Sequence, residues 1–251
     1  MIVDIHMHPP GDAKSEAFTD LIADMDKAGV DLGVLLVVDN ETVTGKVASN
    51  DSMAEIMESY EGRFLCFGSV DPHKGKIAIR EVERLVGELD LRGIKFFPST
   101  QLFYPYDSLV YPLYEKAQEL DIPVLFHSGA PLTAGTHRLK YNQPIHLDEV
   151  AIDFPDLKII CGHMGNPWFM DVYALAERHK NFYFDISGRA REFLPLVPWK
   201  LFEDRISDKV MFGTDMQHSP SEYIEEIRQL PISDAFKEKI LGGNAEKLLG
   251  L

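Results

Sequence analysis

The chain has 251 residues, of which 45% are hydrophobic and 26% charged, a composition typical of globular proteins rather than disordered or fibrous ones. Its mean hydropathy is -0.12, and no apolar run approaches the roughly 20 residues that a membrane-spanning helix needs. Lys and Arg total 25 against 40 Asp and Glu, a net charge of -15 that disfavours polyphosphate chains and anionic surfaces. We therefore expect neither a nucleic acid nor a membrane as partner.

The first residues, 1–6 (MIVDIH), enter an apolar alternating pattern at once. They show neither the basic start nor the apolar core and small-residue cleavage site of a secretory signal. We therefore expect the cytoplasm as the compartment.

Short runs rich in Val, Ile, Phe and Leu recur at a spacing of roughly 30 residues, the length of one strand–helix unit. These predicted strands are 3–8, 32–38, 64–70, 93–97, 124–127, 158–163, 182–187 and 210–215. Between them, apolar residues at helical spacing predict helices, and these cover 16–28, 53–60, 77–89, 109–120, 168–179, 193–202 and 223–229.

This alternation predicts an α/β fold. Strands that alternate with helices pair in parallel, and near-continuous apolar strands fit a sheet buried on both faces. Eight such units in a chain of this length predict one domain, a (β/α)8 TIM barrel over residues 1–251. A doubly wound open sheet would carry a Gly-rich phosphate loop after its first strand, where this chain has HMHPP at 6–10.

In a barrel of this kind the functional groups lie at the carboxyl ends of the strands. The polar residues predicted there are His6, His8, Lys95, His127, His163 and Asp215. Because side chains alternate along a strand, the first two histidines point to the same face, here the barrel interior. Imidazoles together with a carboxylate suit a borderline divalent ion such as zinc. The set therefore predicts a metal site at this end of the barrel.

Four further segments indicate the protein family that this chain resembles. They are GIKFFP at 93–98, CGHMG at 161–165, FGTD at 212–215 and ILGGNAEKLL at 240–249. With the His-x-His of the first strand, they resemble the amidohydrolase-related (amidohydrolase 2) family of the amidohydrolase superfamily, from end to end. That family contains hydrolases, lactonases, hydratases and non-oxidative decarboxylases, so the resemblance defines fold and metal more closely than reaction.

The resemblance implies that His6, His8 and His127 hold a divalent ion, and that Asp215 binds this ion or its water. We expect Zn2+, or another divalent metal such as Mn2+, with one ion bound and two as the alternative. His163 faces the substrate or the metal-bound water in one-metal members, whereas it holds the second ion in two-metal members. Its structural alternative is a core histidine bonded to the backbone.

Lys95 has two interpretations. In two-metal members a carboxylated lysine on the fourth strand bridges both ions, and segment 94–98 resembles such a lysine segment. The alternative is a cation that pairs with an acidic neighbour or with a substrate carboxylate. Burial alone cannot choose between them, because an interior lysine needs a partner in either case.

Three more residues are candidates for substrate binding. Arg189 follows the seventh strand and could hold a carboxylate by its planar fork, or form a surface ion pair. Tyr104, in the aromatic loop 101–107, could line the pocket or pack within the loop. His218, three residues past Asp215, could touch the substrate or lie on the surface.

The leading functional hypothesis is a metal-dependent hydrolase of an amide or lactone bond (C–N or C–O) in a small, carboxylated substrate. A metal-activated water would attack, with Asp215 as general base and His163 supporting the oxyanion or leaving group. The alternative is a metal-dependent lyase, a non-oxidative decarboxylase or hydratase, using the same residues. Lys95 and the short barrel tilt the expectation towards hydrolysis.

The sequence also bears on two other functional classes and on the oligomeric state. The charge of -15 opposes a metallo-phosphodiesterase acting on nucleic acid, and the presence of Asp215 opposes a non-catalytic metal-binding protein. Dimers are common in the family, so the resemblance admits a homodimer, for which the sequence shows no interface signature.

Overall fold

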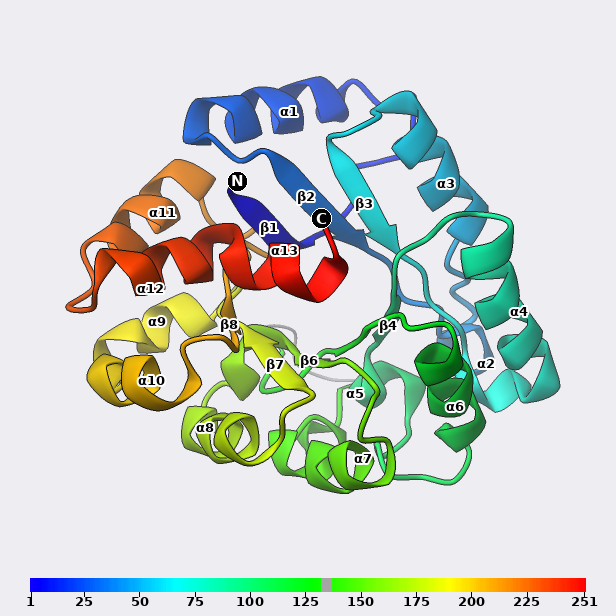
Figure 1. Cartoon of the computed structure of the whole chain (residues 1–251). Coiled ribbons are helices and arrows are strands. Elements are labelled where there is room, and N and C mark those ends of the chain that lie inside the picture. Colours follow the sequence, from blue (N-terminus) through cyan, green and yellow to red (C-terminus); the bar gives the residue numbers. More distant parts are fainter. Residues whose placement is uncertain (132–136) are drawn as a thin grey trace.

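Eight parallel strands form the centre of the computed structural model, which describes residues 1–131 and 137–251 (Figure 1). The strands are β1 (Val3–Met7), β2 (Leu32–Leu36), β3 (Phe64–Phe67), β4 (Ile94–Phe96), β5 (Val124–Phe126), β6 (Ile159–Cys161), β7 (Phe182–Asp185) and β8 (Val210–Met211). Each lies within one predicted run, so the eight predicted strands are confirmed. The last residues of most runs lie just beyond the strand, in the loops that carry the polar side chains.

The strands pair in sequence order in two arcs, β1–β2–β3 and β4–β5–β6–β7–β8, with parallel register throughout. Backbone hydrogen bonds bridge both gaps between the arcs. Gly68 N–H donates to Gly93 O (3.0 Å) between β3 and β4, and Ile5 N–H donates to Phe212 O (3.0 Å) between β8 and β1. The predicted α/β barrel architecture is confirmed.

Helices surround the strands (Figure 1). They are α1 (Ala17–Ala28), α2 (Glu41–Thr44), α3 (Asn50–Ser59), α4 (Lys76–Gly87), α5 (Pro98–Gln101), α6 (Tyr111–Glu119), α7 (Leu147–Asp153), α8 (Phe169–Arg178), α9 (Ala190–Phe193), α10 (Trp199–Ile206), α11 (Pro220–Arg228), α12 (Asp234–Glu238) and α13 (Asn244–Leu249). Six of the seven predicted helices match one of these within a few residues.

The predicted helix over 193–202 is wrong. Helix α9 ends at Phe193, a 3-10 turn covers Leu194–Leu196, and α10 begins only at Trp199. The cause is Pro195 together with Pro198, since proline lacks the N–H that an interior helical position must donate and its ring clashes with the preceding turn.

Two apolar clusters hold the barrel together. The outer cluster fills the space between strands and helices, with Phe96, Phe126 and Phe184 as large members from the strands. The inner cluster occupies the barrel itself and includes Val3, Ile5, Leu32, Val34, Leu36, Phe67, Leu125, Ile160, Met211, Ala245 and Leu248. Its last two members belong to α13, which lies across β1 in Figure 1. This helix therefore covers the amino end of the barrel.

A register shift in β1 determines the direction in which the side chains of His6 and His8 point. Asp4 pairs with Gly33, but Met7 pairs with Leu35, so one residue of β1 has no partner in β2 between them. Such a bulge re-aims the side chains that follow it. Ile5 belongs to the inner cluster and Met7 to the outer one, and His6 therefore joins the interior face just above the apolar layer.

No helix in the described ranges combines the length and the apolar composition needed to cross a lipid bilayer.

Candidate functional site

His6, His8 and Asp215 meet at the carboxyl end of the barrel. Asp215 Oδ1 lies 3.0 Å from His8 Nε2 and 3.6 Å from His6 Nε2. Each of the three offers one ligand atom within 4.8 Å of the others. The backbone joins them as well, since Asp215 N–H donates to His6 O (2.8 Å).

The outer nitrogens of the two β1 histidines have fixed partners. His8 Nδ1 lies 3.0 Å from Leu36 O, and because a carbonyl only accepts, this nitrogen carries the proton. His6 Nδ1 lies 2.9 Å from Asp185 Oδ2 and donates to that carboxylate. In a neutral imidazole the second nitrogen is then an unprotonated acceptor. When both rings are neutral, each Nε2 therefore offers a lone pair in the centre of the cluster, beside the carboxylate of Asp215.

With neutral histidines, these three electron-rich atoms form a set of donors that can bind a cation. Two imidazole nitrogens and a carboxylate oxygen are the donors that zinc and similar divalent ions take, usually with three protein ligands in a catalytic site. The residues of this cluster thus fit a divalent ion on chemistry as well as spacing.

His127 and His163 extend the cluster to the ends of β5 and β6. His127 Nδ1 lies 3.0 Å from His163 Nε2, and the His127 ring stacks on Phe97 with centroids 3.7 Å apart. Within the described residues, His127 Nε2 is buried and lacks a hydrogen-bond partner. A buried acceptor without a partner is costly unless something binds it, so His127 also fits a ligand role.

The protonation of the cluster suits metal binding. Burial, and next the nearby Lys95 charge, lowers the pKa of His6. Burial and the charge of His6 lower the pKa of His163 to about 3, and burial keeps the pKa of His127 well below its usual range. Burial alone would raise the pKa of Asp215, but the His8 hydrogen bond and the nearby histidine charges outweigh it and keep that pKa low. Neutral imidazoles and an ionised carboxylate are the forms that bind metals.

Lys95 reaches the same centre from β4. Its side chain is buried, and its Nζ donates to His6 Nε2 at 3.2 Å. Burial lowers the pKa of Lys95 to about 8, while the charges of Asp185 and Asp215 oppose the shift. If His6 served as a metal ligand, this ammonium would be free to pair with an anionic group of a ligand.

The turns that carry His163 and Asp215 have unusual backbone. His163 and Met164 have φ of 57° and 49°, and Asp215 and Met216 have φ of 56° and 57°. L-residues in this left-handed region cost about 1–3 kcal/mol each. Such strain is retained where the surrounding structure fixes it, as at functional sites. The neighbouring turn needs a glycine, because a Cβ at Gly188 would lie 2.9 Å from Asp215 Oδ2.

Asp185, the last residue of β7, belongs to the cluster but is not among the site residues predicted from the sequence. This carboxylate is fully buried and contacts both His6 and the backbone of His163. A second group of potential ligands consists of His6, His163 and Asp185. The oxygens of Asp185 already accept from protein donors, however, which favours the His6, His8 and Asp215 group for an ion. The end of a strand was the available signal, since Asp185 follows FYF just as Asp215 follows VMFGT.

The three candidate substrate residues lie apart from this cluster or at its edge. Arg189 pairs with Glu192 on the surface at 3.3 Å. Tyr104 stacks on Tyr106 with ring centroids 5.2 Å apart in a separate aromatic group after β4. His218 is nearer, because its Nε2 donates to the carbonyl of Gly188 at 2.9 Å.

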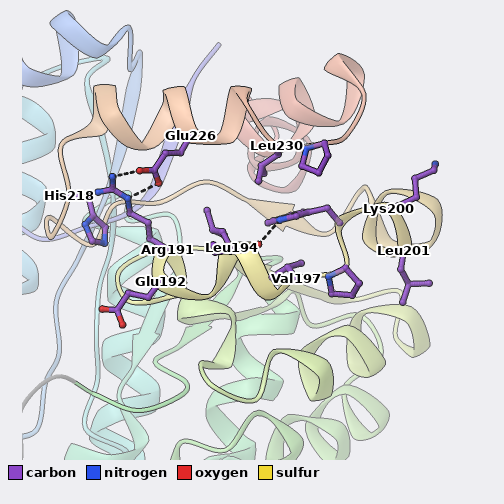
Figure 2. Close-up of a pocket in the computed structure, with 13 residues that line it drawn as sticks. Arg191, Glu192, Leu194, Val197, Lys200, Leu201, His218, Glu226 and Leu230 are labelled. Carbon is purple, nitrogen blue, oxygen red and sulfur yellow. Dashed lines mark hydrogen bonds and ion pairs between the residues drawn. The ribbon is translucent and has the colours of Figure 1, made fainter.

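His218 also stands at one end of an open groove of about 1190 Å³ on the flank of the barrel (Figure 2). Apolar side chains, among them Leu194 and Leu230, line most of it. Arg191 and Glu226 close the end beside His218 through hydrogen bonds of 2.5 and 2.8 Å (Figure 2). The groove thus runs along the outside of the barrel rather than over the histidine cluster.

Comparison with known proteins places the chain in a family. The amidohydrolase model Amidohydro_2 matches residues 3–251. The chain therefore belongs to the amidohydrolase-2 family and is an enzyme of the amidohydrolase superfamily, as its motifs suggested.

Particular relatives narrow this further. The chain is 27% identical over 252 residues to gamma-resorcylate decarboxylase of Polaromonas sp. (strain JS666 / ATCC BAA-500), covering 81% of this chain and 75% of the relative. An uncharacterized TIM-barrel protein, Bb4693 from Bordetella bronchiseptica, has a TM-score of 0.81 and 25% identity, covering 99% and 98% of the two chains. Dihydroxybenzoic acid decarboxylase from Polaromonas sp. JS666, with bound manganese and the inhibitor 2-nitroresorcinol, has a TM-score of 0.73 and 21% identity, covering 100% and 97%.

These relatives favour the lyase alternative over the hydrolase hypothesis that the sequence analysis preferred. The expectation of hydrolysis depends on Lys95 and on the short barrel, and neither feature specifies the reaction. The metal in the solved decarboxylase is manganese rather than zinc.

Proposed function

We propose that this protein is a metal-dependent, non-oxidative decarboxylase of a small carboxylated substrate, with hydroxylated aromatic acids as the first class to test. The observation that carries the proposal is the convergence of His6, His8 and Asp215 beside His127 and His163. The decarboxylase relatives support the reaction type.

His6, His8, His127 and Asp215 would hold one divalent ion, either Mn2+ or Zn2+. When bound, such an ion supplies positive charge that orients an anionic substrate and stabilises negative charge developing on its oxygens. Removing one of these ligands weakens binding strongly. His8→Ala protein prepared with saturating Zn2+ should therefore lose most of its metal after dialysis, and full metal content would contradict the ligand assignment.

The chain's own residues supply the proton that the reaction needs. Loss of carbon dioxide breaks the bond between the substrate carbon and its carboxylate, and the electron pair of that bond stays with the carbon. One proton must be added to the same carbon to balance the step. Asp215 and His163 are the acid–base groups at the centre, and their Oδ2 and Nδ1 atoms lie 4.0 Å apart. Either can deliver the proton after taking it from water or substrate.

Lys95 is proposed to pair with the substrate carboxylate. Its ammonium is the buried cation of the site, and its pKa of about 8 leaves it largely protonated at neutral pH. Carboxylate pairing would satisfy this charge once an ion occupies His6 Nε2. A carbamate on Lys95 bridging two ions remains the alternative. The mass of the native protein at neutral pH distinguishes the two, because a carbamate is lost in acid.

The test is turnover of a panel of hydroxybenzoates by protein loaded with Mn2+ or Zn2+. We expect release of carbon dioxide and, in D2O, one deuterium on the carbon that bore the carboxylate. A matched panel of lactones and amides serves as the control. Cleavage of a lactone or amide without carbon dioxide release would return the assignment to hydrolysis.

A further inference from the structure

Asp185 connects the two halves of the histidine cluster. Its Oδ2 accepts from His6 Nδ1 at 2.9 Å. Its Oδ1 accepts from the backbone N–H groups of His163 (2.9 Å) and Ser187 (3.0 Å), and from Ser187 Oγ at 2.5 Å. Asp185 and Ser187 are both fully buried. All four contacts are with protein donors, so this carboxylate is held as an acceptor.

The proton positions around Asp185 follow from its partners. An ionised carboxylate only accepts, so His6 must donate from Nδ1 and keep Nε2 unprotonated. The contact of Lys95 Nζ with His6 Nε2 agrees, since an ammonium only donates. Ser187 must likewise donate its hydroxyl proton to Asp185.

The same reasoning extends through Ser187 to two more histidines. With its proton used, Ser187 Oγ accepts from His163 Nδ1 at 2.8 Å. In neutral His163 the Nε2 atom is then an acceptor, and it receives His127 Nδ1–H at 3.0 Å. The Nε2 of His127 is left unprotonated, and it is one of the buried side-chain atoms that lack a hydrogen-bond partner within the described residues.

We propose that Asp185 and Ser187 form a positioning pair that fixes the tautomers of His6, His163 and His127, so that each presents an unprotonated Nε2. Neither residue touches the reacting atoms, and both act through the histidines. The inference rests on the proposed function for its kinetic consequence, whereas the tautomers are a property of the metal-free protein.

Asp185→Asn tests the pair because the surrounding donors allow the side-chain amide of the Asn only one orientation. The Asn oxygen must face the backbone N–H groups of His163 and Ser187, because a backbone N–H can donate a hydrogen bond but cannot accept one. The amide NH2 then faces His6 Nδ1, which must become an acceptor and shift its proton to Nε2. We expect 15N spectra of the metal-free variant to show the Nε2–H tautomer at His6, and Zn2+ affinity to fall about 10- to 100-fold.

Ser187→Ala tests the contact with His163 separately from the contact between Asp185 and His6. It removes the acceptor of His163 Nδ1 but leaves the Asp185 contact with His6. We expect the tautomer of His163 to change, that of His6 to stay Nδ1–H, and Zn2+ affinity to fall less than in Asp185→Asn. With a turned-over substrate, kcat should fall about tenfold while KM stays within twofold, since substrate contacts are untouched.

Asp71→Asn is the matched control. Asp71 is also fully buried beyond a strand end, where it accepts from Thr42 and from the backbone of His73. This variant should share any stability loss but leave the tautomers and Zn2+ affinity unchanged. Retention of the Nδ1–H tautomer at His6 in Asp185→Asn, with Zn2+ affinity within twofold of the original, would overturn the inference. Absence of decarboxylation with the expected tautomers would overturn the proposed function alone.

Discussion

The two ends of the barrel use the same strands in opposite ways. At the amino end, Val3 and Ile5 of β1 pack with Ala245 and Leu248 of α13 in the inner apolar cluster. At the carboxyl end, the same strand presents His6 to a set of charged and polar groups. Barrel enzymes commonly divide stability and chemistry in this manner. Within β1, only a few residues therefore separate the apolar amino end, which stabilises the fold, from the carboxyl end, which carries the candidate site.

The largest effect should come from Asp215→Asn at the carboxyl end. The substitution keeps the shape but removes the basicity, so decarboxylation should fall by roughly 10²-fold or more. Thermal stability should change little by comparison. Steady-state kinetics of the metal-loaded variant checks this, with the exposed Asp234→Asn as control. Near-normal turnover would remove Asp215 from the mechanism.

The opposite result is expected at the amino end. Leu248→Ala deletes a buried side chain of α13 and should lower the free energy of unfolding by about 2–5 kcal/mol. Activity per folded molecule should be retained, because no site residue is touched. Urea unfolding measures the loss. The control is Leu251→Ala: the Leu251 side chain is 51% exposed, so this substitution should change the free energy of unfolding by less than about 0.5 kcal/mol. Equal losses in both variants would contradict the role of α13 as a cover.

Asp4 lies between the two ends and should give a pH-dependent effect. Burial raises its pKa to about 7, although hydrogen bonds from Thr214 and His6 oppose the shift. A carboxyl whose folded pKa lies above its unfolded value favours folding while protonated, and this contribution is lost as pH rises from about 4 to 7. The slope is at most about 1.4 kcal/mol per pH unit.

Asp4→Asn should remove that part of the pH dependence. The amide oxygen can still accept from the backbone N–H groups of His6 and Thr214, as Asp4 Oδ1 does now. Melting temperatures of the metal-free proteins from pH 4 to 8 provide the measurement. Parallel curves for the two proteins would show that Asp4 is ionised throughout.

The smallest effect concerns the strained backbone of the carboxyl end. Met216 has a φ of 57° and is 41% exposed, so Met216→Gly relieves strain without opening a cavity. The free energy of unfolding should rise by up to about 1 kcal/mol. Met170→Gly, within helix α8 and similarly exposed, should lower it by about 1 kcal/mol. A loss in both variants would mean that the left-handed turn stores no strain at Met216.

Much of this arrangement could be predicted from the sequence because it depends on local pattern. Apolar runs identified all eight strands, and the strand ends pointed to His6, His163 and Asp215. Asp185 was missed because its importance arises only where it meets His6, 179 positions away in sequence. The left-handed backbone of His163 and Asp215 has no sequence signal either, since glycine is the residue that normally indicates it. The broken helix was a different case, because Pro195 and Pro198 are visible in the sequence.

The bulge in β1 makes this strand sensitive to changes in length. Replacing a side chain between Asp4 and Met7 leaves the pairing with β2 intact. Deleting one residue there would restore regular pairing and turn His6 or its neighbour to the opposite face, because side chains alternate along a strand. Insertions in the surface loops carry no such penalty. The first strand can therefore vary in composition but not in residue count if the histidines are to keep facing Asp215.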